Sequence, residues 1–428
     1  MRPLLALLVL VAVALPTAAR AIDVQLEYAP LSDRDAVSRS SVLKLSTTPP
    51  AGYKLPDATG KLPLYGTIRL GDSEHLLMLD RNGRYERFYT RLRVDANGNR
   101  DLTDDPPVQA GSSVPGAPML TAKSFELKTK HGAAERLCQV SFDLYCADWD
   151  GFRAADFAGD PNKALTATIR ALCCYKGEFE LDGAHYEISL VDSGINGRLD
   201  HSATQSTTSG DTADTLFIKS GGEFGRDDGQ PLGKYLVLGD KLFEVKVDSA
   251  AETLSLEPAR GDAVAKLPRS VCRAAFDRPG GDLSVAMFRP AAQVSLPAGE
   301  WKMISYQLER ADDRGVRWVL TAREGEKPVS FRLDATSATT CVFGEPFSSE
   351  PTVQTNTVST WLTEHLVAVM RIKVKDCAGA NMVGLDQIDD RAAGMPASLQ
   401  NVRKLKNPTW QAFTADGKKV AAGSYEYG

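Results

Sequence analysis

Acidic and amide side chains are concentrated in the segment VDANGNRDLTDDPP, residues 94 to 107, and they give this chain its clearest potential for chemistry. An oxygen-bearing side chain stands at every other position at the start of the segment, and two more follow near its end: Asp95, Asn97, Asn99, Asp101, Asp104 and Asp105. This pattern suits calcium, a hard cation that takes about six to eight oxygen ligands at once. The carboxylates would also repel one another, with only Arg100 among them, unless a cation or solvent screened their charges. The segment therefore predicts a calcium-binding loop, and the alternative is a polar turn held by its own side chains.

Over about a dozen residues the segment resembles the calcium loops of EF-hands, dockerins and thrombospondin type 3 repeats. Asp95, Asn97 and Asn99 match the first three ligand positions of those loops, and Asp101 stands where a backbone carbonyl usually binds the ion. The resemblance implies a calcium site that one of the two following aspartates completes.

Two departures separate the segment from an EF-hand. Arg100 occupies the loop position at which EF-hands have an invariant glycine for a sharp turn, and Pro106 replaces the closing glutamate. A strand-like sequence enters the loop, and Pro106 and Pro107 prevent a helix from starting directly after it. A helix-loop-helix EF-hand is therefore excluded, and we expect a strand to carry the loop.

A second Asp/Asn/Gly segment, VDSGINGRLDHS at residues 191 to 202, is a weaker candidate of the same kind. Asp192, Asn196 and Asp200 are spaced like ligands of a calcium loop, but Gly194 replaces the ligand expected between the first two. A polar turn is again the alternative. Both loops could also converge on one site with Asp211 or Asp214.

Strand patterns dominate the segments that must position these loops. Residues 366 to 375 alternate between apolar and polar side chains, which predicts a strand with one buried face. Residues 300 to 310 and 316 to 323 flank a polar turn and predict a hairpin, and a second hairpin is predicted around Asp416 and Gly417. Asn82 and Gly83 predict a further hairpin turn. Helical periodicity longer than about ten residues is absent after residue 21.

The predicted fold class is therefore mainly β and multidomain, with antiparallel sandwiches. We expect β-rich domains over residues 22–265, which carry both acidic loops, and an immunoglobulin-like sandwich region over residues 266–428. The boundary follows a polar stretch punctuated by Pro258, Gly261 and Pro268.

The first 21 residues predict a secretory signal peptide. Arg2 precedes an apolar run from Leu4 to Leu15, and the small residues Ala19 and Ala21 suit a cleavage site. The run is too short to span a bilayer, and no later segment resembles a membrane span. Removing residues 1–21 takes away two arginines and no acid, which moves the net charge from -5 to -7. A secreted or periplasmic protein with that charge does not suit nucleic acid, and a glycan or a protein at the cell surface is the expected class of partner.

Seven cysteines suggest disulfides in such a compartment, and their odd number leaves at least one unpaired within the chain. A bridge is expected between the segment with Cys138 and Cys146 and the adjacent pair Cys173 and Cys174, with the partners left open. Buried free thiols are the alternative. A second bridge could use the remaining three: Cys272, Cys341 and Cys377.

Catalytic signatures such as GxSxG, HExxH, a P-loop or a Rossmann glycine motif are absent from the sequence, and its five histidines have no metal-ligand spacing. The sequence favours a non-catalytic β-protein, a binding or scaffold module with a structural calcium loop, and whether it is an enzyme stays open. The loop and the C-terminal DGKKVAAGSYEYG resemble secreted bacterial β-rich proteins of unassigned function. The alternative is a carbohydrate-active protein, either a glycan binder that stacks sugars on tryptophans or a glycoside hydrolase with two carboxylates.

Overall fold

The computed structural model describes the chain in fifteen ranges: residues 20–31, 41–58, 62–81, 89–109, 120–131, 134–146, 165–199, 213–220, 229–280, 283–311, 315–325, 328–359, 364–388, 409–413 and 419–424. These ranges consist of β-strands and their connections and contain no helix, so none of their segments is a helix that could cross a membrane. The prediction of a mainly β, multidomain protein is confirmed. The predicted signal peptide lies outside the described residues, apart from residues 20 and 21.

The largest sheet has twelve strands and joins segments that lie far apart in the sequence. All its pairings are antiparallel except the one between β15 and β20. From one edge to the other, its strands are β1 (Ile22–Gln25), β17 (Thr253–Pro258), β16 (Lys241–Asp248), β15 (Tyr235–Leu238), β20 (Ser284–Phe288), β19 (Val271–Asp277), β22 (Gly299–Ala311), β23 (Arg317–Arg323), β28 (Asn381–Ile388), β27 (Glu364–Lys375) and β26 (Ser348–Ser359), with β24 (Ser330–Leu333) paired to β22.

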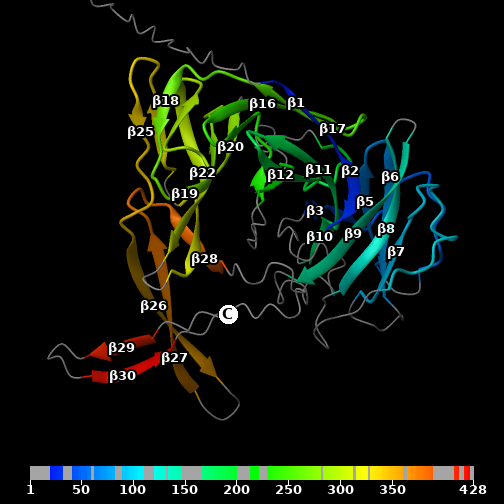
Figure 1. Cartoon of the computed structure of the whole chain (residues 1–428). Helices are drawn as coiled ribbons and strands as arrows, with labels where there is room; N and C mark the ends of the chain where they lie inside the picture. Colours follow the sequence, from blue (N-terminus) through cyan, green and yellow to red (C-terminus); the bar gives the residue numbers. More distant parts are fainter. Residues whose placement is uncertain are drawn as a thin grey trace, which may run out of the picture.

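Three smaller antiparallel sheets carry and surround the acidic loops, and Figure 1 shows two of them at the opposite end of the molecule from β18 and β25. The first has the order β4 (Leu45–Ser46), β5 (Leu64–Leu70), β6 (Ser73–Asp80) and β7 (Arg91–Val94). The second has the order β3 (Ser41–Leu43), β10 (Leu165–Ala171), β9 (Ala134–Cys146) and β8 (Leu120–His131). The third has the order β14 (Gln230–Pro231), β13 (Thr215–Ser220), β12 (Ala184–Val191), β11 (Cys173–Leu181) and β2 (Glu27–Pro30).

Two further sheets are small. One has the order β21 (Gln293–Leu296), β18 (Ala263–Lys266) and β25 (Thr339–Thr340), and the other pairs β29 (Thr409–Phe413) with β30 (Lys419–Ser424).

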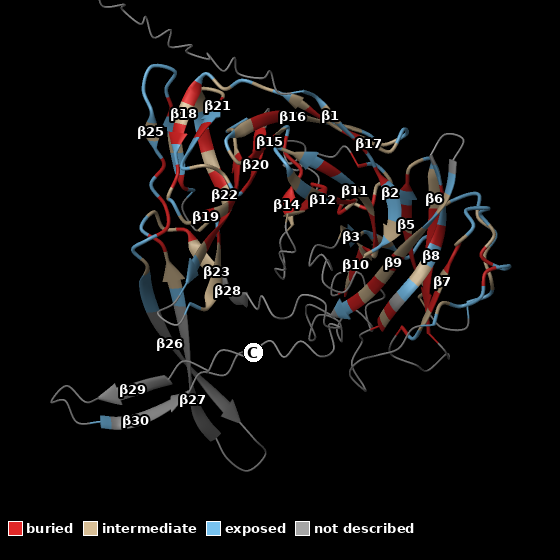
Figure 2. Ribbon diagram, in the orientation of Figure 1, coloured by how far each residue is buried: buried red, intermediate tan, exposed pale blue. Residues whose placement is uncertain are grey.

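Apolar side chains form three large buried clusters between these sheets. Figure 2 marks the buried residues of the strands in red. The first lies between the sheets of β5 to β7 and of β8 to β10, and includes Phe142 and Ile169. The second packs β18, β19 and β22 around Trp301 and Tyr306. The third joins β11 to β13 with β15 to β17 around Phe243. Burial of apolar area in several separate cores, rather than one, is what a multidomain β-protein requires.

The predicted hairpins of the C-terminal part are present. β22 pairs with β23 and β29 pairs with β30, both antiparallel, and β27 covers the alternating segment. The turn predicted at Asn82 and Gly83 lies outside the described ranges, although β6 and β7 on either side of it do pair.

The twelve-stranded sheet draws strands from both sides of residue 265, since β1, β16 and β17 precede that position and β19 to β28 follow it. The division into residues 22–265 and 266–428 stays a prediction. An immunoglobulin-like arrangement of the C-terminal part is not confirmed.

Candidate metal centre

The first acidic loop, which we define as residues 95 to 105, begins where β7 ends and is held between neighbouring strands. The backbone N–H of Asp95 donates to the carbonyl of Leu76 on β6 at 2.8 Å, and the carbonyl of Ala96 accepts from Lys128 on β8 at 2.8 Å. Leu102, near the far end of the loop, is fully buried in a small apolar cluster. These contacts fix the loop against the sheet, as expected for a strand-borne site.

Asp95 is the centre of the loop. Its side chain is fully buried, with Oδ1 accepting from the N–H of Asn99 at 3.1 Å and Oδ2 from the N–H of Arg100 at 2.9 Å. These bonds require a sharp turn, and both Gly98 (φ 71°) and Arg100 (φ 67°) have left-handed backbone. Arg100 therefore makes the turn that an EF-hand makes with glycine, although a side chain in this region is strained. Its guanidinium lies 5.7 Å from the ring centre of Tyr53.

Each of the next three predicted ligands accepts a hydrogen bond from the backbone two residues further on. Asn97 Oδ1 accepts from Asn99 at 2.9 Å, Asn99 Oδ1 from Asp101 at 2.7 Å, and Asp101 Oδ1 from Thr103 at 2.9 Å. Such Asx turns are the kind of polar turn, held by its own side chains, that is the alternative to a calcium-binding loop. They also hold a row of oxygens in fixed positions, and the side-chain oxygens of Asn97 and Asn99 each keep a second lone pair.

The carboxylate of Asp101 points to a different partner. Its Oδ2 lies 2.7 Å from Nζ of Lys54, and the hydroxyl of Thr103 donates to Oδ1. The hydrogen bonds from Lys54 and Thr103 lower the pKa of Asp101 to about 2. Asp104, which is exposed, accepts from the amide of Asn99 at 2.8 Å. The structure therefore joins Asp104 to the row of ligands through Asn99, and ties the Asp101 side chain to a lysine.

Asp105 is the least satisfied carboxylate of the loop. Its side chain is 7% exposed, Oδ1 accepts a long hydrogen bond of 3.3 Å from the N–H of Ala96, and Oδ2 is buried with no hydrogen-bond partner among the described residues. Burial raises the pKa of Asp105 to about 6, and the nearby charge of Asp95 adds to this effect. A charged oxygen in such a place is costly unless a cation or a further donor reaches it.

His75 lies under the loop and was not among the predicted ligands. Its ring is fully buried on β6, Nδ1 lies 2.8 Å from the carbonyl oxygen of Asp95, and Nε2 is buried without a partner in the described part of the chain. Burial lowers the pKa of His75, which keeps the imidazole neutral. Sequence reasoning treated it as a lone structural histidine, since nothing local links residue 75 to residue 95.

The second loop, residues 192 to 199, repeats the backbone of the first. Asp192 Oδ1 accepts from Asn196 at 3.1 Å and Oδ2 from Gly197 at 2.6 Å, the same offsets from the aspartate as in the first loop. The left-handed residues also recur at the same offsets, in Ile195 (φ 51°) and Gly197 (φ 75°). Leu199 is buried at the position equivalent to Leu102.

Both loops thus share the pattern V-D-x-x-x-N-x-x-L, at residues 94–102 and 191–199. Sequence reasoning compared each loop with known calcium loops and missed this internal duplication. Aligning the two segments on the aspartate and the buried leucine would have found it.

The second loop has fewer described oxygens near it. Asp200 and Asp211 lie outside the described residues, so their participation and the convergence of both loops stay predictions. Asp214 is fully buried and directly precedes Thr215, the partner of Val191 in the ladder between β12 and β13.

One other group of metal-ligand type occurs in the described ranges: Glu178, His185 and Glu187 on β11 and β12, with their ligand atoms within 4.8 Å of one another. All three side chains are exposed, so water screens their charges and no ion is needed to stabilise them.

The tryptophans give mixed support to a glycan-binding role. Trp301 is fully buried, and its indole N–H donates to the carbonyl of Pro297 at 3.0 Å, so this ring lies in the core. Trp318 is partly buried. Trp361 and the side chain of Trp410 lie outside the described part of the chain.

Comparison with known proteins gives no assignment: no family model, no curated protein and no solved structure matches this chain. The loop is therefore interpreted from its own geometry.

Proposed function

We propose that this protein is a secreted, non-catalytic β-protein whose first acidic loop binds a structural calcium ion. The observation that carries the proposal is the buried Oδ2 of Asp105, which has no hydrogen-bond partner within the part of the chain that the structure describes and lies in the same loop as the buried carboxylate of Asp95. Two carboxylates withdrawn from water at neutral pH favour a positive charge beside them. The guanidinium of Arg100 lies near the ring of Tyr53, and that of Arg93 donates to the backbone carbonyl of Asp105 at 3.0 Å rather than to its carboxylate.

The proposed ligands follow from the hydrogen bonds of the loop. Asp95 and Asp105 supply the charged oxygens, and the side-chain oxygens of Asn97 and Asn99 supply neutral ones. Asp101 contributes its backbone carbonyl, as the equivalent residue of an EF-hand does, because Lys54 already holds its carboxylate. Asp104 or water completes the coordination shell.

Calcium suits this set better than magnesium or zinc. Magnesium demands a near-octahedral site and keeps several of its waters, whereas calcium accepts irregular shells of many oxygens. Zinc prefers nitrogen and sulfur ligands. The imidazole of His75 contacts the backbone carbonyl oxygen of Asp95 through Nδ1 and does not contact the Asp95 carboxylate through that atom.

The role of the ion in this proposal is to stabilise the fold. Extracellular calcium modules have dissociation constants of about 0.1 to 1 mM. At about 1 mM calcium and the tighter end of this range, binding stabilises the folded state by about 1.4 kcal/mol. This free energy is enough to fix the loop against β6 and β8, and a partner at the cell surface would then meet a rigid loop.

Thermal melting of the mature protein in EDTA and in millimolar calcium tests the proposal. We expect calcium to raise the Tm of the wild type by about 3 to 6 °C and to leave the Tm of Asp95→Ala unchanged. Asp57→Asn is the matched control, because Asp57 is an exposed aspartate outside both loops. Equal melting of wild type and Asp95→Ala in both buffers would rule out calcium at this loop.

A further inference from the structure

Cys138 on β9 and Cys173 on β11 bring their side chains into contact. Their Sγ atoms are 3.3 Å apart, and both side chains are thiols in this structure. The two residues belong to different sheets, so a bond between them would join the sheet of β8 to β10 with the sheet of β11 to β14.

The strand register explains why these two cysteines meet. β10 pairs with β9 up to Ala171 and Val140, and the N–H of Leu172 then donates to the carbonyl of Gln139 at 2.8 Å. The next opposite positions in this antiparallel ladder are Cys173 and Cys138. Leu172 and Gln139 share only this one hydrogen bond, because the N–H of Gln139 donates to the hydroxyl of Tyr28 and the carbonyl of Leu172 accepts from Leu31. A disulfide bond has an S–S length of about 2.05 Å, so the Sγ atoms of Cys138 and Cys173, 3.3 Å apart, need to approach by only about 1.2 Å to form one.

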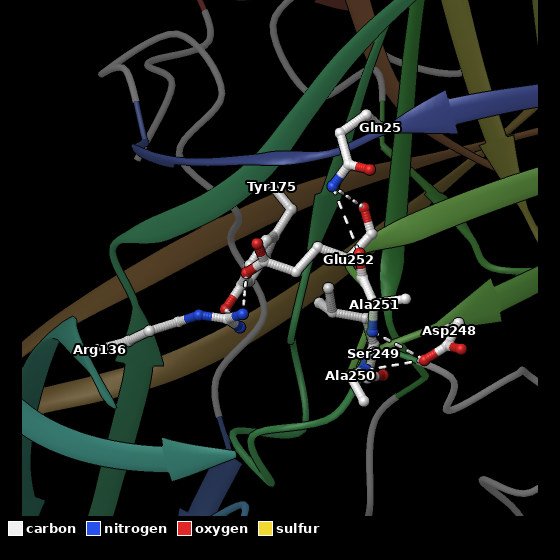
Figure 3. A network of polar contacts seen from close by, with 9 residues as sticks. Gln25, Arg136, Tyr175, Asp248, Ser249, Ala250, Ala251 and Glu252 are labelled. Carbon is white, nitrogen blue, oxygen red and sulfur yellow. Dashed lines mark hydrogen bonds and ion pairs between the residues drawn. The ribbon is translucent and has the colours of Figure 1, made fainter. Parts of the chain in front are cut away.

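The contacts on the same face keep the two strands in this register. Two residues along each strand, Arg136 donates to the hydroxyl of Tyr175 at 2.9 Å and also pairs with Glu252, as Figure 3 shows. Tyr28 packs edge-on against Tyr175, with ring centres 5.6 Å apart. The cysteine pair therefore lies beside hydrogen bonds and ring contacts that fix the position of β9 relative to β11.

Only one of the adjacent cysteines can reach Cys138. Neighbouring side chains on a strand point to opposite faces, and Cys174 is fully buried with its Sγ 3.7 Å from the carbonyl oxygen of Ala29 on β2. Cys138 is partly exposed, which gives a small oxidant a route to the pair.

We propose that Cys138 and Cys173 are a modification site, oxidised to an intramolecular disulfide by a low-molecular-weight disulfide or a thiol-disulfide oxidoreductase. The thiolate of one cysteine attacks a sulfur of the external disulfide and releases a thiolate. The second cysteine gives its proton to that thiolate, attacks the mixed disulfide and releases the other half of the oxidant as a thiolate. The protein loses two electrons, and the external disulfide is reduced to one thiol and one thiolate. Hydrogen bonds from Cys138 and Tyr28 lower the pKa of Cys173, which favours the thiolate form of that residue.

Peptide mapping of the mature protein after incubation with oxidised glutathione tests this assignment. Free thiols are alkylated under denaturing conditions before digestion with trypsin. We expect a cross-link between the tryptic peptides LCQVSFDLYCADWDGFR and ALCCYK, which contain residues 137–153 and 171–176. We also expect oxidation to raise the Tm by about 5 to 10 °C, and dithiothreitol to reverse this rise.

Single serine variants identify the two sulfurs, because each peptide contains two cysteines. The cross-link should persist in Cys146→Ser and Cys174→Ser, and it should be lost in Cys138→Ser and Cys173→Ser. If Cys138→Ser and Cys173→Ser do not fold, the wild type, Cys146→Ser and Cys174→Ser are sufficient to identify the two linked cysteines. Alkylation of Cys138 and Cys173 in the oxidised wild type, or a cross-link that disappears in Cys146→Ser or Cys174→Ser, would overturn the proposal. This inference is independent of calcium binding.

Discussion

Replacement of Asp105 by asparagine gives the most discriminating prediction, because the expected gain in stability depends on calcium. Asparagine has the shape of aspartate and keeps the oxygen that accepts from Ala96, but it carries no charge. A pKa raised from 3.8 to about 6 corresponds to about 3 kcal/mol against the charged carboxylate in the folded state. Water that reaches the loop reduces this cost, so we expect Asp105→Asn to stabilise the calcium-free protein at pH 7 by about 1 to 3 kcal/mol.

Calcium should reduce this difference in stability between the variant and the wild type. In the wild type the ion neutralises the carboxylate and adds about 1.4 kcal/mol at about 1 mM, whereas the variant lacks the charged ligand and gains little. Urea unfolding followed by tryptophan fluorescence measures both differences in the free energy of unfolding. One buffer contains EDTA, and the others contain calcium at about 1 mM and about 10 mM, which are near the physiological and the saturating level.

Asp57→Asn is again the control, because the same chemical change at an exposed position should leave both free energies of unfolding within about 0.5 kcal/mol of the wild type. The reasoning is refuted if Asp105→Asn is less stable than the wild type in EDTA, or if it responds to calcium as the wild type does.

The two loops give four further predictions. Protonation of Asp105 competes with calcium, so the affinity measured by calorimetry should fall roughly tenfold from pH 7 to pH 5, and a constant affinity would contradict this. Folding raises the pKa of this carboxyl, so the folded state binds the proton more tightly, and in EDTA stability should fall as the pH rises from about 4 to 6. Gly197→Ala should destabilise the protein by about 3 kcal/mol or more, because the added Cβ would lie 2.0 Å from the backbone nitrogen of Gly71. Gly183→Ala is its control, because the φ of Gly183 is also positive but an added Cβ meets nothing within 4 Å. This variant should lose about 1 to 2 kcal/mol of stability. Equal losses for the two variants in urea unfolding would contradict the packing argument. Arg100→Gly should relieve left-handed strain and raise the free energy of unfolding by up to about 1 kcal/mol, whereas a loss of stability would show that the contact with Tyr53 matters more.

Local patterns in the sequence were sufficient to predict the strand-borne character of the first loop. Alternating Asx residues form turns with their own backbone, and Pro106 and Pro107 end any helix, so both properties depend only on neighbouring residues. The pattern also suggested that Arg100 would resist a left-handed backbone, yet the structure has φ 67° there. Two hydrogen bonds to Asp95 and the anchored Leu102 determine that turn, which shows that tertiary contacts can outweigh a local preference.

Contacts between distant segments were beyond the reach of such patterns. His75 and Lys54 meet the loop through strand pairing and packing across many residues, and no local signal marks either as a neighbour of Asp95 or Asp101. The pairing of β1 with β17 joins segments more than 200 residues apart, as Gln25 and Ala251 show. Periodicity predicts that a strand exists and which face it buries, but not which strand it joins.

The cysteines show the same limit more sharply. The sequence predicted a bridge between two segments and left the partners open, because both members of each pair were equally available. Only the register that sets Gln139 opposite Leu172 selects Cys138 and Cys173.

A direct calcium titration of the chelator-treated mature protein, by isothermal calorimetry, tests the central claim most directly. The account predicts saturable binding with a dissociation constant of about 0.1 to 1 mM in the wild type and in Asp57→Asn, with the site lost in Asp105→Asn. Absence of saturable binding up to about 10 mM calcium, or an unchanged affinity in Asp105→Asn, would contradict calcium binding by the first acidic loop.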